Sequence, residues 1–187
     1  MFEIKVDSNI SLELLDLNRA NEIFELGLKN KEEFIKWLPW VEETKSVENT
    51  KEFIKESLEN FAEGKEINCS ILYREQLVGN IALMGINKKF NIKRGEIGYW
   101  LDGSFQKRGI MSKAALKMIA IGFERLELNK IVIRCDKNNI NSCNVARRLG
   151  FREDGLLRGE AVVNGKIVDM RIFSLLKGEY YKNKNIC

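Results

Sequence analysis

The spacing of apolar residues changes character about one third of the way along the chain. An opening stretch at Phe2–Val6 and a strand at Ile10–Leu15 come first. Apolar residues then recur every three or four positions, which is the period of amphipathic helices. We expect three helices in this part: one capped by Asn18, a short one over Glu32–Trp37, and a longer one that begins at Ser46.

The second part of the chain predicts mainly strands. Its apolar runs are rich in β-branched residues and are separated by polar turns, a pattern typical of strands. The expected strands are Ile67–Tyr73, Leu77–Ile86, Arg94–Leu101, Lys130–Cys135, Leu157–Val163 and Lys166–Leu175. Helices are expected through Ala114–Phe123 and Asn139–Leu149. Asn164-Gly165, between the last two strands, indicates a type I′ hairpin turn.

The order of these elements predicts one α/β domain over residues 1–187. Strands joined by short turns pair antiparallel, so most of the sheet should be antiparallel, with helices packed on both faces. The connection from Arg94–Leu101 through a helix to Lys130–Cys135 instead requires a parallel pair. We therefore expect a mixed, mostly antiparallel and twisted sheet.

Composition excludes several kinds of chemistry. The chain has 187 residues, four cysteines and no histidine. Without histidine there is no Ser-His-Asp or Cys-His nucleophile and no imidazole ligand for a metal. Cys69, Cys135, Cys143 and Cys187 form no CxxC pair, so we expect reduced thiols and no metal site. Catalysis would then depend on carboxylates, hydroxyls, backbone amides and a bound cofactor.

Charge is unevenly distributed along the chain. Residues 1–87 hold 10 Lys and Arg against 17 Asp and Glu, whereas residues 88–187 hold 21 against 10. The basic half would attract a polyanion and the acidic half a basic substrate. Nucleic acid is the weaker interpretation, because no aromatic stacking motif accompanies the basic residues. No apolar run approaches the ~20 residues that span a bilayer, and no signal-peptide core is visible, so we expect a cytoplasmic protein without a membrane partner.

The most informative segment covers residues 96–112. A strand enters a loop that contains Gly103 and Gly109, and this loop leads directly into a helix. Free amides at a helix N-terminus, together with the helix dipole, bind phosphate groups. Lys107 and Arg108 would add positive charge. The segment predicts a diphosphate site made of main-chain N–H groups, although it matches neither the P-loop nor the GxGxxG fingerprint.

The loop Gln106-Lys107-Arg108-Gly109 is one of several motifs that match a known family. It resembles the Q/R-x-x-G-x-G/A loop of the GNAT superfamily of acetyl-CoA-dependent N-acetyltransferases. Further segments resemble its RimJ/RimL branch, which acetylates the α-amino groups of ribosomal proteins: Trp37–Trp40, Glu96–Trp100, Asn139–Ser142, Leu149–Phe151, Gly155–Arg158 and Asn164–Lys166. The resemblance covers nearly the whole chain. It implies a GNAT-like fold, acetyl-CoA as co-substrate, a basic ribosomal-protein N-terminus as acceptor and, by analogy alone, a homodimer.

Two positions depart from the pattern of this superfamily. Met111 stands where most members have Gly or Ala, and Ala146 stands where many have a tyrosine that acts as general acid. RimJ/RimL relatives rely instead on the serine of an Asn-x-x-Ser motif. The resemblance therefore implies that Ser142 donates a hydrogen bond to the departing thiolate and that Asn139 holds the pantetheine arm.

Acetyl transfer from a thioester requires a neutral amine. An α-amine has a pKa of about 8, so a base must remove one proton at neutral pH. Glu96 is the first candidate because it lies on the strand that leads into the loop, Glu160 is the second, and solvent water is the third. Main-chain N–H groups of Tyr99–Leu101 would polarise the thioester carbonyl and pair with pantetheine as an added strand. Transfer would be direct, without a covalent acyl-enzyme.

These interpretations give a defined set of site residues. Glu96 and Ser142 are the expected catalytic residues. The expected cofactor-binding residues are Tyr99, Trp100, Leu101, Gln106, Lys107, Arg108, Gly109, Ile110, Met111, Ser112, Asn139 and Ser142.

Acidic residues near the first helices are candidates for acceptor recognition. They bracket the Trp37–Trp40 segment, whose tryptophans we expect to pack around a turn, and they are Glu32, Glu33, Glu42 and Glu43. Two alternatives remain open at this point. The acceptor could be a small-molecule amine such as a polyamine, amino sugar or antibiotic, or the protein could be a non-catalytic sensor of acyl-CoA.

Overall fold

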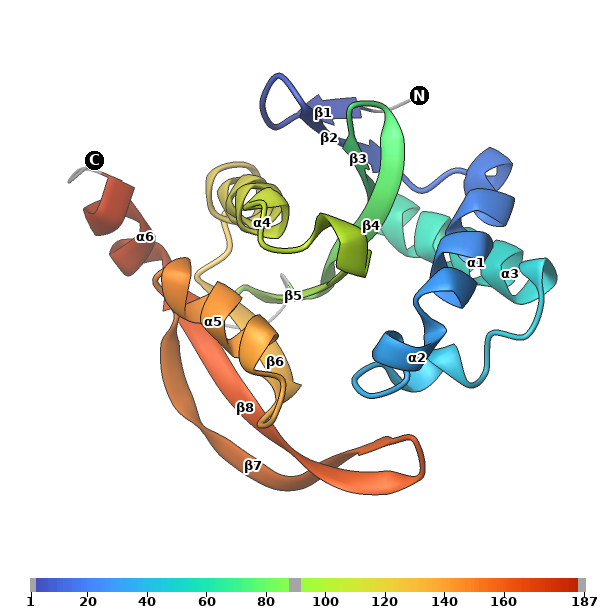
Figure 1. The fold of residues 1–187 in the computed structure, drawn as a ribbon. Coiled ribbons are helices and arrows are strands. Elements are labelled where there is room, and N and C mark those ends of the chain that lie inside the picture. Colours follow the sequence, from blue (N-terminus) through green and yellow to red (C-terminus); the bar gives the residue numbers. More distant parts are fainter. Residues whose placement is uncertain (1–2, 88–91, 185–187) are drawn as a thin grey trace.

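Eight strands form one sheet in the computed structural model, which describes residues 3–87 and 92–184 (Figure 1). Their order across the sheet is β1-β2-β3-β4-β5-β6-β8-β7. The strands are β1 (Glu3–Lys5), β2 (Ile10–Leu14), β3 (Ile67–Tyr73), β4 (Gln76–Asn87), β5 (Arg94–Leu101), β6 (Lys130–Asp136), β7 (Arg152–Val163) and β8 (Lys166–Leu176). Phe2 and Cys187 lie outside the described residues.

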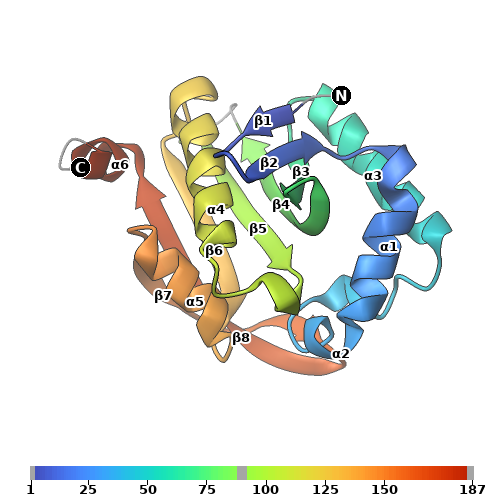
Figure 2. The same cartoon turned by 45° about the horizontal axis from the view of Figure 1, so that its top comes forward.

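Helices lie on both faces of this sheet (Figures 1 and 2). On one face, Ile23 of α1 and Ile54 of α3 pack against Leu72 and Leu77 of the sheet. On the other face, α4 packs on β2, β4 and β5, and α5 packs on β6 and β7. The helices are α1 (Ala20–Lys29), α2 (Lys31–Phe34), α3 (Val47–Ala62), α4 (Ile110–Ala120), α5 (Ile140–Arg148) and α6 (Lys177–Lys184). None of these described helices is long and apolar enough to cross a membrane.

The sheet confirms the expected mixed topology. Six of its neighbouring pairs are antiparallel, and β5 pairs with β6 in parallel. The parallel pair is joined through α4, as the long connection between these strands predicts. The fold is therefore a single-domain α/β fold with a mostly antiparallel sheet.

The parallel pair separates partway along its length. β5 and β6 are in register only from Arg94↔Lys130 to Glu96↔Val132. Beyond this point β5 stays paired with β4 up to Leu101, and β6 stays paired with β8 up to Asp136. Each strand follows its antiparallel neighbour, so the sheet opens between the C-terminal halves of β5 and β6. A gap of this kind leaves backbone N–H and C=O groups of β5 available to an extended ligand.

The core beneath α4 is built to bring this helix close to the sheet. Ala114, Ala115 and Met118 of α4 are fully buried and pack with Ile81 and Ile97. Small side chains let the helix backbone approach the strands, and burial of each large aliphatic residue contributes roughly 1.5–3 kcal/mol. The N-terminus of α4 is thereby held at the open end of β5.

The helix α4 begins at Ile110, directly after the loop, as expected, and it closes in a π-helical turn over Ile121–Arg125.

Several other expected boundaries are wrong, for local reasons. Asn18 does not cap α1: Asp16 accepts a hydrogen bond from the Asn18 amide and starts a short 3-10 turn before the helix. The helix α2 is shorter than Glu32–Trp37, β7 begins five residues before the expected Leu157, and α6 was not expected because its apolar pattern is weak.

Gly79 provides a test of how tightly β4 and β5 approach at the open end of the sheet. A Cβ atom at this position would overlap the main-chain carbonyl oxygen of Trp100, which cannot move without breaking the strand pair. We expect Gly79→Ala to lower the free energy of unfolding by about 1–3 kcal/mol. Gly27→Ala is the control, because a Cβ there meets nothing within 4 Å and alanine favours the helix. Urea unfolding of both variants checks this, and an unchanged Gly79→Ala would contradict it.

Candidate active site

Two cavities meet at the end of β5. The first cavity, of about 500 Å³, lies between the loop before α4, the N-terminal half of α5 and the segment after α2. The second cavity, of about 640 Å³, lies on the opposite face of the sheet beneath α1 and α3. Leu38, Tyr99 and Trp100 line both cavities. A group bound in one cavity can therefore reach a group bound in the other.

The N-terminus of α4 opens into the first cavity with its amides free. Gly109 precedes the helix in a left-handed conformation with φ of 75°, and no side chain caps the helix. Among the described residues, the amides of Ile110, Met111 and Ser112 have no hydrogen-bond partner. Lys107 also lines the cavity. Free amides, the helix dipole and a cation are features suited to an anion such as a diphosphate, and we call this place the anion site.

Most of the expected cofactor-binding residues lie around this cavity. The residues that line it are Tyr99, Trp100, Leu101, Gln106, Lys107, Gly109, Ile110, Met111, Ser112, Asn139 and Ser142. Arg108 is the exception: its guanidinium lies 5.0 Å from the centroid of the Phe105 ring and donates to Ser104 O at 3.0 Å. Arg108 therefore stabilises the loop rather than pointing at the ligand space.

The loop is fixed to the end of α1 by two contacts. Lys29 Nζ lies 2.7 Å from Asp102 Oδ2, and Gly103 N donates to Asn30 Oδ1 at 3.0 Å. The Asp102 side chain is 2% exposed. Burial raises the pKa of this carboxyl, but the hydrogen bonds from Lys29 and from the Ser104 amide outweigh burial, so its pKa lies below the ordinary value. These contacts join the end of α1 to the loop that carries the anion site.

Ser142 is held at the first cavity through its amide, its carbonyl and its hydroxyl. Asn139 caps α5 and accepts from the Ser142 amide at 3.1 Å. The phenol of Tyr99 lies 3.0 Å from Ser142 Oγ and 3.3 Å from Ser142 O. Burial raises the pKa of Tyr99, so the phenol stays protonated and can donate. When it donates to Ser142 Oγ, the Ser142 proton is free to point into the cavity.

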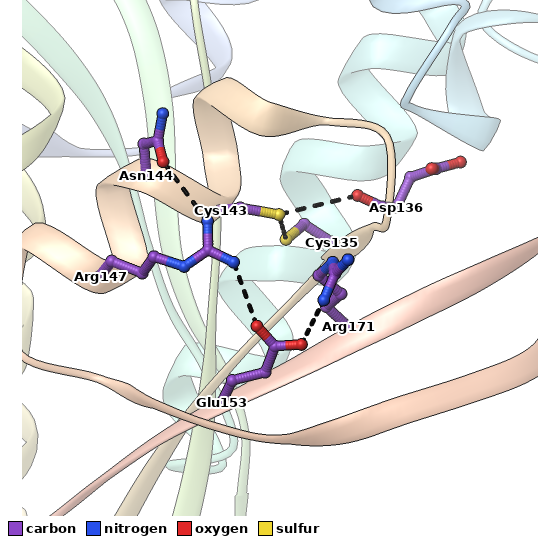
Figure 3. Close-up of polar contacts among 7 residues, drawn as sticks. All are labelled: Cys135, Asp136, Cys143, Asn144, Arg147, Glu153 and Arg171. Atoms are coloured by element: carbon purple, nitrogen blue, oxygen red, sulfur yellow. Dashed lines mark hydrogen bonds and ion pairs between the residues drawn. The ribbon is translucent and has the colours of Figure 1, made fainter.

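A cluster of ion pairs behind Ser142 fixes α5 to the β7–β8 hairpin (Figure 3). Arg147 Nη2 lies 3.1 Å from Glu153 Oε2, and Arg171 pairs with the other oxygen of the same carboxylate. Burial raises the pKa of Glu153, but the hydrogen bonds from Arg171 and Arg147 outweigh burial. The pKa therefore lies below its ordinary value, and this carboxyl is ionised. The Cys135 and Cys143 thiols lie 3.3 Å apart beneath the helix, and burial raises the pKa of Cys135 to about 12. Cys135 is thus a protonated packing residue.

The two candidate bases share one guanidinium. Arg134 Nε donates to both oxygens of Glu96, at 3.0 and 2.9 Å, and Arg134 Nη1 lies 3.4 Å from Glu160 Oε1. The hydrogen bond to Glu96 raises the pKa of Arg134. Glu96 lies on the same face of the sheet as Gly98 and Trp100, and neither Glu96 nor Glu160 lines a cavity. Glu96 is tightly held, whereas Glu160 keeps one oxygen without a partner among the described residues.

Only two of the four acidic residues expected to recognise the acceptor line a cavity. Glu33 lines the first cavity and pairs with Lys36, and Glu43 lines the second cavity. Glu32 and Glu42 line neither. Trp40 packs against Trp100 with ring centroids 6.1 Å apart.

Sequence reasoning missed the contribution of α5. Asn141, Asn144 and Arg148 also line the first cavity. Their spacing of three and four residues puts them on one face of the helix, which is the signal that could have identified them. This face presents amide groups and a cation to the ligand space.

Together these features are suited to an extended, phosphorylated ligand. The anion site fits a diphosphate, and the open edge of β5 fits an amide-containing arm that pairs as a strand. The family model described as "Acetyltransferase (GNAT) domain" matches residues 10–152. The chain therefore belongs to the GNAT acetyltransferase family and is an acetyl-CoA-dependent N-acetyltransferase.

Individual relatives are similar over nearly their whole length. YdaF of Bacillus subtilis (strain 168), which carries a provisional name as a ribosomal N-acetyltransferase, is 34% identical over 98% of this chain and 100% of its own. The ribosomal-protein-serine acetyltransferase of Escherichia coli (strain K12) is 30% identical over 91% and 94%. The crystal structure of RimL, a ribosomal L7/L12 α-N-protein acetyltransferase in complex with coenzyme A, has a TM-score of 0.89 at 26% identity and covers 94% of this chain and 98% of that one.

The Asp102 contact predicts a specific pH dependence of stability. Because the folded-state pKa lies below the ordinary 3.8, the stabilisation is complete above about pH 5 and is lost as the pH falls through the folded-state pKa. We expect Asp102→Asn to lower the free energy of unfolding by about 1–2 kcal/mol at neutral pH. The difference from the natural chain should shrink below pH 4.

Denaturant unfolding between pH 2.5 and 7 measures this difference. Glu63→Gln is the control, because Glu63 pairs with Lys65 on an exposed surface and such pairs are worth at most about 1 kcal/mol. A deficit of Asp102→Asn that stays constant down to pH 2.5 would contradict the assigned pKa shift.

Proposed function

We propose that this enzyme acetylates the N-terminal α-amine of a protein, with a ribosomal protein as the first candidate. The main observation in support is that Tyr99 and Trp100 line both cavities. The anion site lies in one cavity, and the other offers space for an acceptor. The E. coli relative that is 30% identical over most of both chains is named for acetylation of a ribosomal protein, which supports this acceptor class.

Acetyl-CoA would occupy the first cavity. The free amides of Ile110, Met111 and Ser112, together with Lys107, would bind its diphosphate. The edge of β5 near Tyr99 would pair with the pantetheine arm, and the co-substrate supplies the acetyl group as a thioester. Transfer from the thioester to the amine would be direct, without a covalent acyl-enzyme.

Ser142 would stabilise the departing thiolate. Its hydroxyl lies at the wall of the first cavity, 3.0 Å from the Tyr99 phenol oxygen. When the phenol donates its one proton to Ser142 Oγ rather than to Ser142 O, the serine proton is available to the leaving sulfur. Since a thiol has a pKa of about 8.5, a hydrogen bond from a neutral hydroxyl is sufficient. Tyr99 acts through Ser142 and is a positioning residue.

Glu160 is favoured over Glu96 as the group that takes the proton from the amine. The transfer would pass through water, because neither carboxylate lines a cavity. Arg134 engages both oxygens of Glu96 but makes one long contact with Glu160. A carboxylate with an unengaged oxygen can accept a proton, whereas Glu96 fixes Arg134 in place. This reverses the order of the two candidates that the sequence favours.

Turnover with a panel of amines tests the proposal. Release of coenzyme A thiol would be followed with N-terminal peptides of ribosomal proteins, with polyamines and with amino sugars. Turnover of peptides supports the proposed acceptor, and turnover of small amines alone would replace it. Binding of acetyl-CoA without turnover of any amine would indicate a sensor of acyl-CoA.

Ser142→Ala should lower kcat on the order of 10²-fold while leaving the KM for acetyl-CoA unchanged, because the hydroxyl acts when the thiolate departs. Tyr99→Phe should lower kcat about fivefold, since it removes one hydrogen bond. Ser142→Thr keeps a hydroxyl and should retain more activity than Ser142→Ala. Steady-state kinetics measures all three, and full activity of Ser142→Ala would exclude the assigned role.

Glu160→Gln should reduce kcat/KM at neutral pH on the order of 10²-fold, which is the usual contribution of a general base. The deficit should shrink as the pH rises through the amine pKa of about 8, because the acceptor then arrives neutral. Glu96→Gln should lose less activity, and Glu59→Gln, on the exposed side of α3, serves as the control. Equal losses for Glu96→Gln and Glu160→Gln at every pH would refute this assignment.

A further inference from the structure

The second cavity contains a carboxylate held by neutral donors alone. Glu66 accepts hydrogen bonds from Asn68 Nδ2 at 2.8 Å, from Ser57 Oγ at 3.2 Å and from Asn60 Nδ2 at 3.5 Å. No Lys or Arg of the described residues forms an ion pair with it. Three hydrogen bonds fix its position, and its negative charge is left without a counterion.

Asn80 adds an acceptor that faces the same space. Its amide nitrogen donates to Asn68 Oδ1 at 2.8 Å and to Cys69 O at 3.0 Å. Because the Cys69 carbonyl can only accept, this contact fixes which end of the Asn80 amide is the nitrogen. Asn80 is 7% exposed and lines the cavity, and its oxygen has no donor among the described residues.

Thr50 carries a second unused polar group on the wall of this cavity. It lies on α3, is 4% exposed and lines the cavity, and its hydroxyl makes no hydrogen bond to any described residue. The Asn80 oxygen and the Thr50 hydroxyl thus have no partner among the described residues and belong to residues that line one cavity, where a ligand can engage both.

The remaining wall of the second cavity favours a cation. Its charged lining residues are Glu43, Glu52, Glu56, Glu66 and Lys31, so carboxylates outnumber ammonium groups by four to one. Trp40 and Trp100 contribute aromatic faces, which attract ammonium groups. A carboxylate, a free amide oxygen and aromatic faces together are complementary to an alkylammonium ion.

We propose that the second cavity binds a second alkylammonium group on the acceptor, with Glu66 as its anchor and Asn80 as an additional hydrogen-bond acceptor. This inference rests on the proposed function, because it assumes that the acceptor amine reacts where the two cavities meet. The acceptor class is then an amine that carries a further protonated amine along its chain. A lysine side chain near a peptide N-terminus and a free polyamine share this chemistry.

Pairs of acceptors that differ only in this charge test the proposal. N-terminal peptides with lysine at the second, third or fourth position would be compared with the same peptides containing norleucine. In parallel, 1,4-diaminobutane would be compared with 1-aminobutane. We expect the charged member of at least one pair to have a kcat/KM about tenfold or more above its neutral match, and the successful series distinguishes a peptide from a polyamine.

Glu66→Gln then identifies the anchor. It keeps a side chain of the same size, and it should reduce the charged-to-neutral ratio about tenfold through the KM of the charged acceptor. Glu59→Gln is the control: Glu59 is exposed on α3 and lines neither cavity, so this variant should leave the ratio unchanged. Thermal unfolding and the KM for acetyl-CoA show whether Glu66→Gln is folded.

Neutral acceptors that react as well as charged ones in the natural chain would overturn the inference, as would a ratio that Glu66→Gln leaves intact. Calorimetric titration of each pair in the presence of coenzyme A separates this failure from failure of the proposed function. Preferential binding of the charged acceptor without turnover would refute the function and keep the subsite. Turnover without any preference for charge would keep the function and refute the subsite.

Discussion

The separation of β5 from β6 after Glu96 and Val132 is the constraint on which the site depends. Each strand stays with its antiparallel neighbour, so the two parts of the sheet diverge and expose one edge of β5. The helix α4 fills the space above this edge and brings its free N-terminal amides to the opening. Neither feature alone would bind an extended diphosphate-containing molecule, but together they supply both the anion site and the strand edge.

Contacts between distant segments keep this opening in shape. Lys29 and Asn30 at the end of α1 hold the loop before α4 through Asp102 and Gly103. On the other side, Glu153 joins Arg147 of α5 to Arg171 of β8, so that Ser142 is presented on a fixed helix. Positions held on rigid elements favour catalysis by orientation, because the reacting groups need little rearrangement.

Local sequence rules predicted the parts of the fold that depend on local physics. The parallel crossover, the Asn164-Gly165 turn, with both residues at positive φ, and the start of α4 directly after Gly109 followed from spacing and turn residues. The Glu96–Arg134–Glu160 cluster could not be predicted, because it joins three strands whose lateral arrangement the sequence does not show. For the same reason, the cluster that Asn68 makes between Glu66 and Asn80 could not be predicted. Arg108 was expected to line the ligand space, but its guanidinium packs on Phe105 and Ser104 of its own loop.

The central claim is that the opening beside β5 and the bare N-terminus of α4 form the acetyl-CoA site. Titration of 15N-labelled protein with coenzyme A, followed by amide chemical shifts, tests it most directly. The account predicts saturating shifts at Ile110, Met111 and Ser112 and along Tyr99–Leu101. Shifts confined to another surface, or no response of the α4 amides at saturation, would contradict it.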